Sequence, residues 1–136
     1  MNSFESIPLE PRKIPVLKGI TAWTPVLVTE DREVIIESGV NESCDFALRA
    51  DGDGMAPTIL AGDLVFIRSQ NSVADGEIAV VAIGDEIAIK RIFHGPGDSI
   101  QLICDNSAKY RPAIAELIGL DRIRILGRVI GLKRTL

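Results

Sequence analysis

Short runs of apolar and β-branched residues, separated by turn residues, dominate the chain from Phe46 onward. Runs of about four to eight such residues between turn signals are typical of β-strands. Gly84-Asp85 fits a two-residue hairpin turn whose first position needs φ > 0, so the flanking runs should be antiparallel neighbours. The predicted strands are Leu64–Ile67, Glu77–Ile83, Glu86–Phe93, Ser99–Cys104 and Arg122–Arg134.

Helical signals are sparse by comparison. One turn is expected from Ala56 to Leu60, stopped by Gly62, and another near Ala113 to Leu117. The predicted fold class is therefore mostly β, a single domain of strongly bent antiparallel sheets with one or two short helical turns. A length of 136 residues suits one domain. Residues 1–13, with two prolines, predict an extended arm, and residues 14–136 the folded domain.

Composition and charge limit the classes of function. With 46% hydrophobic and 25% charged residues the chain is globular. A net charge of −4 provides no overall positive field, so a role on DNA would need another module. Residues 1–10 do not resemble a secretion signal, and no apolar run has the length of a membrane span. We expect a cytoplasmic protein without membrane contact.

The sequence offers no metal or cofactor site. Cys44 and Cys104 lie sixty residues apart without Cys-x-x-Cys spacing, and His94 is the only histidine. We expect both cysteines to be reduced core residues, and His94 to be an exposed turn residue. A catalytic triad that uses histidine is excluded.

A turn rich in glycine is the first candidate for chemistry. Gly52-Asp53-Gly54-Met55 precedes Pro57, and this pattern predicts a sharp elbow that exposes backbone N–H groups and one side chain, as a nucleophile requires. The two glycines could equally serve a turn that needs positive φ. Asp53 is expected to complement the N–H groups at the start of the helical turn.

Lys90 is the second candidate. The strand period of two places it on the same face as Ala88 and Ile92. Apolar neighbours disfavour the ammonium form, so an inward-facing Lys90 could act as a general base that activates a serine. The alternative is an ordinary strand lysine on a solvated face.

These segments together resemble a known family, the C-terminal self-cleaving domain of LexA and lambdoid phage repressors, over roughly Ile14 to Arg134. The matching segments are Phe46–Arg49, Gly52–Thr58, Gly62–Val65, Gly76–Val80, Ile89–Arg91 and Ile125–Gly131. The resemblance implies a Ser-Lys peptidase fold that cuts its own chain at an Ala-Gly bond when an activated RecA filament binds, which is control of the SOS type. It also implies that the domain holds a DNA-binding repressor as a dimer.

The chain departs from this family at two positions. Gly54 stands where the family has its nucleophilic serine, between Asp53 and Met55 of the elbow and oxyanion region. Residues 14–28 resemble the cleavage segment, with Trp23 after Ala22 where the family has glycine. Lys90 remains as the general base. We predict a chain that does not cleave itself, so its status as an enzyme is uncertain.

Two questions stay open at this stage. Gly54 is either an engineered substitution or a natural feature of a peptidase that has lost its activity. Trp23 either packs in the core or occupies the empty cleft as part of an uncut substrate.

The last predicted strand is the candidate dimer interface. Alternation places four arginines on one face, together with three apolar residues: Arg122, Arg124, Arg128, Arg134, Leu126, Ile130 and Leu132. A solvated face is one interpretation. The resemblance implies that this strand pairs with its copy, which would also hide a hydrophobic edge strand. The expected interface residues are Ile125, Arg128, Val129 and Ile130.

The leading hypothesis is a regulatory and dimerisation domain of a LexA or phage-repressor type protein. It would form a homodimer and could also contact a RecA filament. It would reach DNA only through a helix-turn-helix module absent from this chain or through a partner repressor. The alternative is a UmuD-like accessory protein of a translesion DNA polymerase. An active signal peptidase would need the serine and a membrane anchor.

Overall fold

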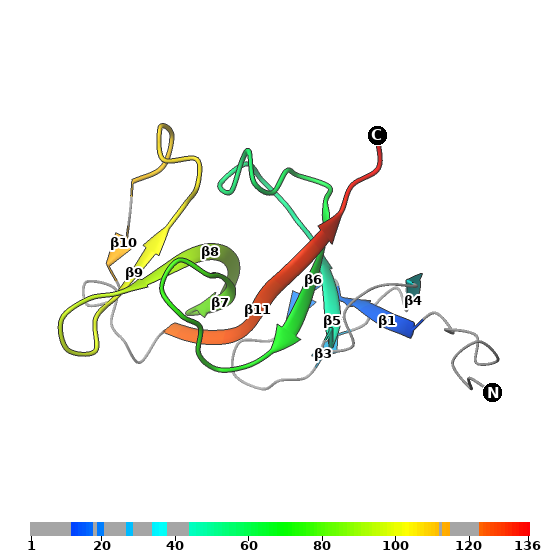
Figure 1. Ribbon diagram of the computed structural model, residues 1–136, viewed down its shortest axis with the longest axis horizontal. Coiled ribbons are helices and arrows are strands. Elements are labelled where there is room, and N and C mark those ends of the chain that lie inside the picture. The colour runs from blue at the N-terminus through cyan, green and yellow to red at the C-terminus, as the bar shows by residue number, and fades with distance from the viewer. Residues whose placement is uncertain are drawn as a thin grey trace, which may run out of the picture.

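Strands make up nearly all of the regular structure in the computed structural model (Figure 1). The model describes residues 12–17, 19–20, 27–28, 34–37, 44–111, 113–114 and 123–136, and before residue 44 and at 113–114 the only side chain described is that of Val16. Within these ranges there is no helix, so the expected mostly β, antiparallel class is confirmed.

Nine strands form one continuous sheet in the order β10-β9-β8-β7-β11-β6-β5-β1-β4, and β2 pairs with β3 separately. All pairings are antiparallel except that of β1 with β5. The strands are β1 (Arg12–Leu17), β2 (Gly19–Ile20), β3 (Leu27–Val28), β4 (Val34–Glu37), β5 (Phe46–Arg49), β6 (Leu64–Ser69), β7 (Ile78–Ile83), β8 (Glu86–His94), β9 (Ile100–Ile103), β10 (Ala113–Ile114) and β11 (Ile123–Lys133).

The predicted hairpin is present. Ile83 of β7 pairs with Glu86 of β8, and Gly84 between them has φ 59°. A two-residue turn of this kind needs positive φ, which glycine adopts without a steric penalty. The hairpin matters for the site because β8 carries Lys90.

The single helical turn expected from Ala56 to Leu60 is matched by one turn, whereas the turn expected near Ala113 is wrong. Between residues 55 and 59 a single backbone bond of helical spacing forms, from Ile59 N–H to the Met55 carbonyl, and no helix follows. Ala113 and Ile114, expected in a helical turn, form β10 against β9. Residues 115–117 lie outside the described residues.

The C-terminal strand lies in the middle of the sheet, which corrects the expectation of an edge strand. β11 crosses Figure 1 diagonally, and it pairs with β7 through residues 123–128 and with β6 through residues 127–133. Register shifts between Ile125 and Gly127 and between Val129 and Gly131 break its alternation. The predicted single face of arginines therefore does not exist, because each bulge moves the following side chains to the other face.

Three apolar clusters fill the bends of the sheet. Ile67 and Val80 belong to the first, Phe66 to the second, and Ile92 and Leu102 to the third. Both cysteines are buried and reduced, as predicted. In the described part of the chain, no helix is long and apolar enough to cross a membrane.

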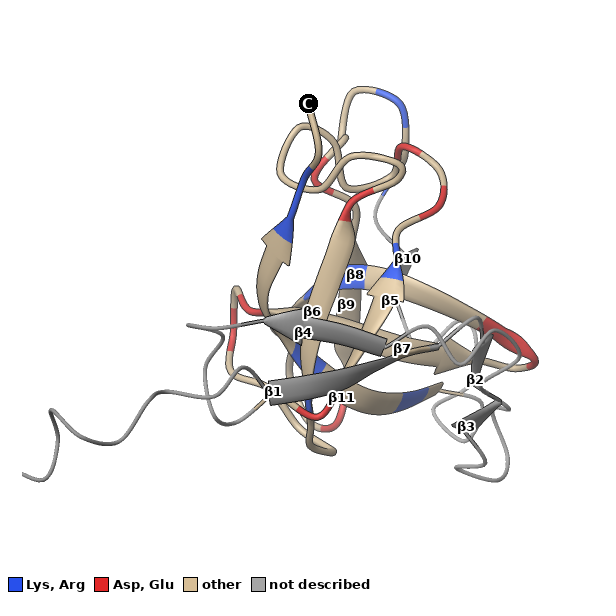
Figure 2. Ribbon diagram, turned by 90° about the vertical axis from the view of Figure 1, so that its right-hand side faces the viewer, with Lys and Arg blue, Asp and Glu red and all other residues tan. Residues whose placement is uncertain are grey.

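Charged residues are distributed over the whole domain. Figure 2 shows basic and acidic positions interspersed along the strands and loops that are described, and several of them form ion pairs.

Candidate active site

An elbow between β5 and β6 carries the glycine-rich segment. Two backbone hydrogen bonds join the two ends of this elbow, from Ala50 N–H to the Asp63 carbonyl and from Gly62 N–H to the Ala50 carbonyl. Gly52 has φ 78°, so the turn requires positive φ at this position, as predicted. Gly54 is not among the residues with positive φ, so its backbone permits a side chain.

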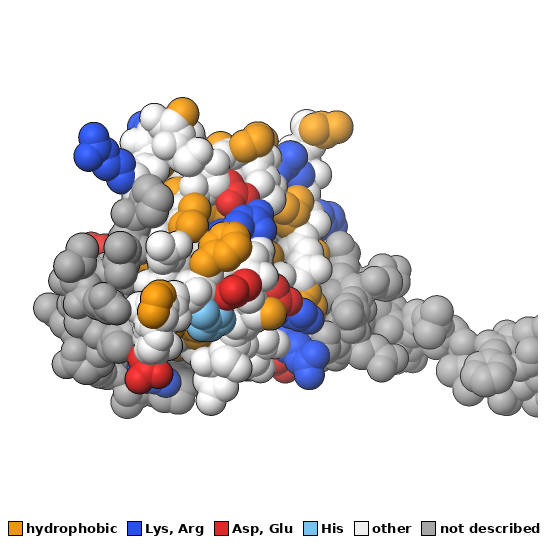
Figure 3. Space-filling view, turned by 60° about the vertical axis from the view of Figure 1, so that its left-hand side comes forward, with side chains coloured by type: hydrophobic (Ala, Val, Ile, Leu, Met, Phe, Trp, Pro, Cys, Tyr) orange, Lys and Arg blue, Asp and Glu red, His pale blue; other side chains and the backbone are white. Residues whose placement is uncertain are grey.

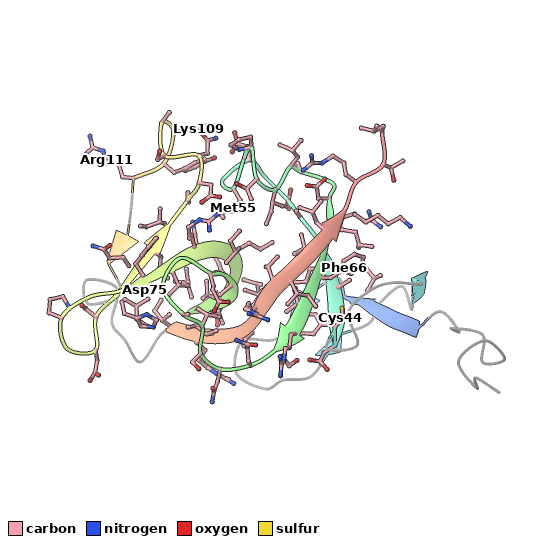
Figure 4. All side chains as sticks on the ribbon, in the orientation of Figure 1. Cys44, Met55, Phe66, Asp75, Lys109 and Arg111 are labelled. Carbon is pink, nitrogen blue, oxygen red and sulfur yellow. The ribbon has the colours of Figure 1, made fainter. Side chains whose placement is uncertain are left out.

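The loop after β9 holds the elbow in place. Asn106 donates its backbone N–H to the Gly54 carbonyl at 3.0 Å and its amide Nδ2 to the Asp53 carbonyl at 3.1 Å. Figure 4 shows Lys109 on this loop, close to the segment that carries Met55. These bonds hold the elbow backbone in place, because the loop supplies hydrogen-bond partners that water would otherwise provide.

The Asp53 carboxylate does not cap the turn, contrary to expectation. It accepts hydrogen bonds from Lys109 Nζ at 2.7 Å and from the Tyr110 hydroxyl at 2.5 Å. The hydrogen bond from Lys109, and after it that from Tyr110, lowers the pKa of Asp53. Lys109 and Tyr110 were not predicted as partners, since they lie more than fifty residues further along the chain.

A second ion pair ties β8 to the same loop. The Arg91 guanidinium donates to both oxygens of Asp105 at 2.7 Å, and the Thr58 hydroxyl donates to Asp105 Oδ2 at 2.6 Å. The hydrogen bond from Arg91 is the main cause of the lowered pKa of Asp105. Two parallel bonds between a guanidinium and a carboxylate fix orientation as well as distance. Sequence reasoning missed this pair.

Asp63 anchors the far end of the elbow. Its buried carboxylate, 1% exposed, accepts two bonds from the Arg134 guanidinium at 2.7 and 2.6 Å and one from Leu60 N–H at 2.7 Å. The hydrogen bond from Arg134 is the largest cause that lowers the pKa of Asp63 to about 2. The contact joins the elbow to the residue that directly follows β11.

A cleft of about 360 Å³ lies between the elbow and β8. Both candidate site residues, Gly54 and Lys90, line it, and so does Met55, whose side chain is buried. The other lining residues are Leu48, Arg49, Ala50, Asp51, Gly52, Ile59, Ile87, Ala88 and Ile89. The lining is mixed, with aliphatic side chains beside the charged residues Arg49, Asp51 and Lys90.

Lys90 contacts a cysteine that the sequence did not mark as part of a site. Its Nζ donates to Cys104 Sγ at 2.9 Å. A Cβ built on Gly54 would lie 3.7 Å from the same sulfur. Gly54, Lys90 and Cys104 therefore form one cluster. The only signal in the sequence was the position of Cys104 at the end of a predicted strand.

The remaining predicted residues lie elsewhere. Ala22 and Trp23 lie outside the described residues, and from the segment 14–28 only short strands are described. The expected interface residues are half-buried on β11: Ile125, Arg128, Val129 and Ile130. Arg128 donates a hydrogen bond to Glu77 at 2.7 Å, and the three apolar residues pack against the apolar clusters.

His94 ends β8 and is exposed, as predicted. Its Nδ1 lies 2.6 Å from Asp75 Oδ1. On the face shown in Figure 3, hydrophobic side chains stand as separate spots among charged and polar ones. No group of three residues suited to a metal occurs in the described part of the chain.

The comparisons with known proteins agree with this geometry. The Peptidase S24-like family matches residues 15–130. Relatives named LexA repressor are 36% identical in Clostridium tetani, 37% in Desulforamulus reducens and 30% in Cupriavidus metallidurans, over 89%, 89% and 90% of this chain. The chain spans 60%, 55% and 56% of their lengths.

Proposed function

Because the chain belongs to the Peptidase S24-like family, we propose that it is the regulatory domain of a LexA-type repressor whose self-cleavage site has no nucleophile. One observation carries the second half of this proposal. Residue 54 is glycine at the tip of the elbow, in the same cleft as Lys90. Without a hydroxyl there, no acyl-enzyme can form from this position.

The rest of the site supports the assignment of roles. A serine at position 54 would project into the cleft toward the amine of Lys90, which would take its proton. Asp53 and Met55 set the position of the elbow, Asp53 through its bonds to the loop after β9 and Met55 through burial beneath it. Loss of the nucleophile from such a unit removes most of the rate enhancement, because its members act together.

The proposal includes a homodimer formed through β11. Beyond Arg128 this strand pairs with β6 alone among the described strands, and the proposal places its copy against the other edge of this part of β11. Antiparallel pairing of that edge with its copy would give a two-fold interface and cover unpaired backbone groups. DNA would be bound by another module or a partner repressor, and contact with a RecA filament belongs to the same proposal.

The test is incubation of the purified chain at about pH 10, close to the pKa of free lysine, where a lysine base is deprotonated. We expect the intact mass to persist by mass spectrometry for days. Two fragments split after Ala22 would overturn the proposal that the chain does not cleave itself. If the unmodified chain stays intact while Gly54→Ser is cleaved, the result supports both the role of the cleft and the missing nucleophile.

A further inference from the structure

The glycine at position 54 leaves an open position in front of one sulfur atom. A Cβ at this position would lie 3.7 Å from Cys104 Sγ, and apart from its chain neighbours no other described residue would come within 4 Å of it. The residue is only 4% exposed, yet its sulfur forms a wall of this open position. Gly54 lines the cleft and Cys104 does not, so the place of the missing side chain is what lies between the cleft and the sulfur.

The amine of Lys90 lies on the other side of the same sulfur. Its Nζ is 2.9 Å from Cys104 Sγ, within the range of a hydrogen bond that involves sulfur. A thiol with an adjacent base is the arrangement that activates a cysteine nucleophile, since the thiolate is the reactive form. Cys104 is thus a buried thiol paired with an amine and next to the position left open at Gly54.

The second cysteine differs in each of these respects. Cys44 is fully buried, and its Sγ lies 3.5 Å from the Phe46 carbonyl oxygen. It belongs to an apolar cluster with Ala47 and Phe66. The same chain therefore contains an internal control for the reactivity of a buried thiol.

We propose that Cys104 and Lys90 form a reactive thiol site that a small hydroperoxide oxidises through the position left open at Gly54. The Lys90 amine takes the thiol proton, and the sulfur attacks one peroxide oxygen. The O–O bond breaks, an S–O bond forms, and the leaving hydroxide takes the proton from Lys90. Sulfur is oxidised by two electrons to a sulfenic acid, and peroxide is reduced to water.

The open position also favours a small oxidant over a large one. A Cβ at position 54 would lie 3.7 Å from Cys104 Sγ, so the missing side chain leaves room beside the sulfur for a molecule as small as hydrogen peroxide. The new oxygen on sulfur would occupy the place of the missing side chain. The product would place a polar, acidic group beside Lys90 at the base of the cleft, and oxidation would thereby alter what the cleft binds.

The experiment treats the full chain with hydrogen peroxide in the presence of dimedone, which traps sulfenic acids, and follows both cysteine peptides by mass spectrometry. We expect adducts on Cys104 to form at least about tenfold faster than on Cys44, as reactivity follows thiolate character and access. Equal rates at the two cysteines would overturn the proposal.

Gly54→Ala tests whether the oxidant reaches Cys104 through the open position, in a variant that is expected to fold. The added Cβ contacts Cys104 Sγ at an ordinary 3.7 Å and the backbone permits it, so the variant should fold. We expect it to slow oxidation of Cys104 several-fold and to leave Cys44 unchanged. Gly131→Ala, whose Cβ would lie 3.8 Å from Phe66, is the matched control and should alter neither rate. An unchanged Cys104 rate in Gly54→Ala would overturn the proposal.

Lys90→Met tests the amine. It retains the length of the side chain and removes the proton acceptor, so oxidation of Cys104 should fall roughly tenfold. A rate equal to that of the unmodified chain, with a native circular dichroism spectrum, would show that Lys90 has no part in the reaction and would overturn its assigned role.

Discussion

The sulfur of Cys104 lies 2.9 Å from the amine of Lys90. This contact means that the proposed base already has a partner while residue 54 has no side chain. A serine introduced at position 54 would therefore compete with Cys104 for the same amine. The cluster gives a direct way to test the roles of its three residues.

Gly54→Ser should restore self-cleavage at high pH. The serine Cβ fits at 3.7 Å from Cys104, and its hydroxyl would share the cleft with Lys90. We expect fragments split after Ala22 to appear by mass spectrometry, and to appear faster in Gly54→Ser/Cys104→Ala, because the second change frees the amine. Lys90→Met in either background should abolish the fragments. If a folded Gly54→Ser/Cys104→Ala chain stayed uncut, other natural differences from the family, Trp23 among them, would also prevent self-cleavage.

Gly127→Ala should be strongly destabilising. A Cβ at this position would lie 2.5 Å from Ile67 Cγ2 and 2.7 Å from the Arg68 carbonyl oxygen, because β11 is held between β6 and β7 there. Overpacking of this kind costs about 1–3 kcal/mol in the free energy of unfolding, measured by urea denaturation. Gly131→Ala on the same strand has only an ordinary contact with Phe66 and should change the free energy by less than about 1 kcal/mol. Equal effects of the two changes would contradict the central placement of β11.

Stability should depend on pH through Asp63. Its pKa is lowered from 3.8 to about 2, chiefly by Arg134, so the folded chain holds the charged form more strongly than the unfolded chain does. The resulting stabilisation is complete above about pH 5 and is lost as the pH falls through 4 toward 2. Urea denaturation at a series of pH values should show that Asp63→Asn is less stable than the unmodified chain at pH 7, and that the difference shrinks below pH 4.

A carboxylate elsewhere provides the control for this measurement. Asp98 is exposed in the turn between β8 and β9, and Asp98→Asn removes the same charge without an ion pair of the Asp63 type. If the gap between the unmodified chain and Asp63→Asn stayed constant from pH 7 to pH 2, the bond to Arg134 would not stabilise the fold.

The oligomeric state should depend on the end of β11. Leu132 is 37% exposed on the part of β11 that, among the described strands, pairs with β6 alone. Sedimentation of the unmodified chain at tens of micromolar should show a dimer, and Leu132→Lys should shift it toward monomer, since like charges at a two-fold interface oppose each other. Leu60→Lys, at a residue of similar exposure on the elbow, is the control and should leave the dimer intact. A strict monomer before any substitution would exclude this interface.

The sequence by itself determined strands β6, β7, β8, β9 and β11, the hairpin between β7 and β8, and the candidate positions 54 and 90. Each of these depends on neighbours in the chain: alternation sets the faces of a strand, Gly84 permits the turn, and the glycines mark the elbow. Only the tertiary structure decided the central place of β11 and its two bulges, because alternation does not state which strands pair.

The same distinction applies to the site. Lys90 meets Cys104 across 14 residues of sequence, Asp53 meets Tyr110 across 57, and Asp63 meets Arg134 across 71. Each pair combines common residue types that have many possible partners, so composition and spacing carry no signal for it. The sheet brings these segments together when its apolar faces are buried, and the polar contacts follow from that packing.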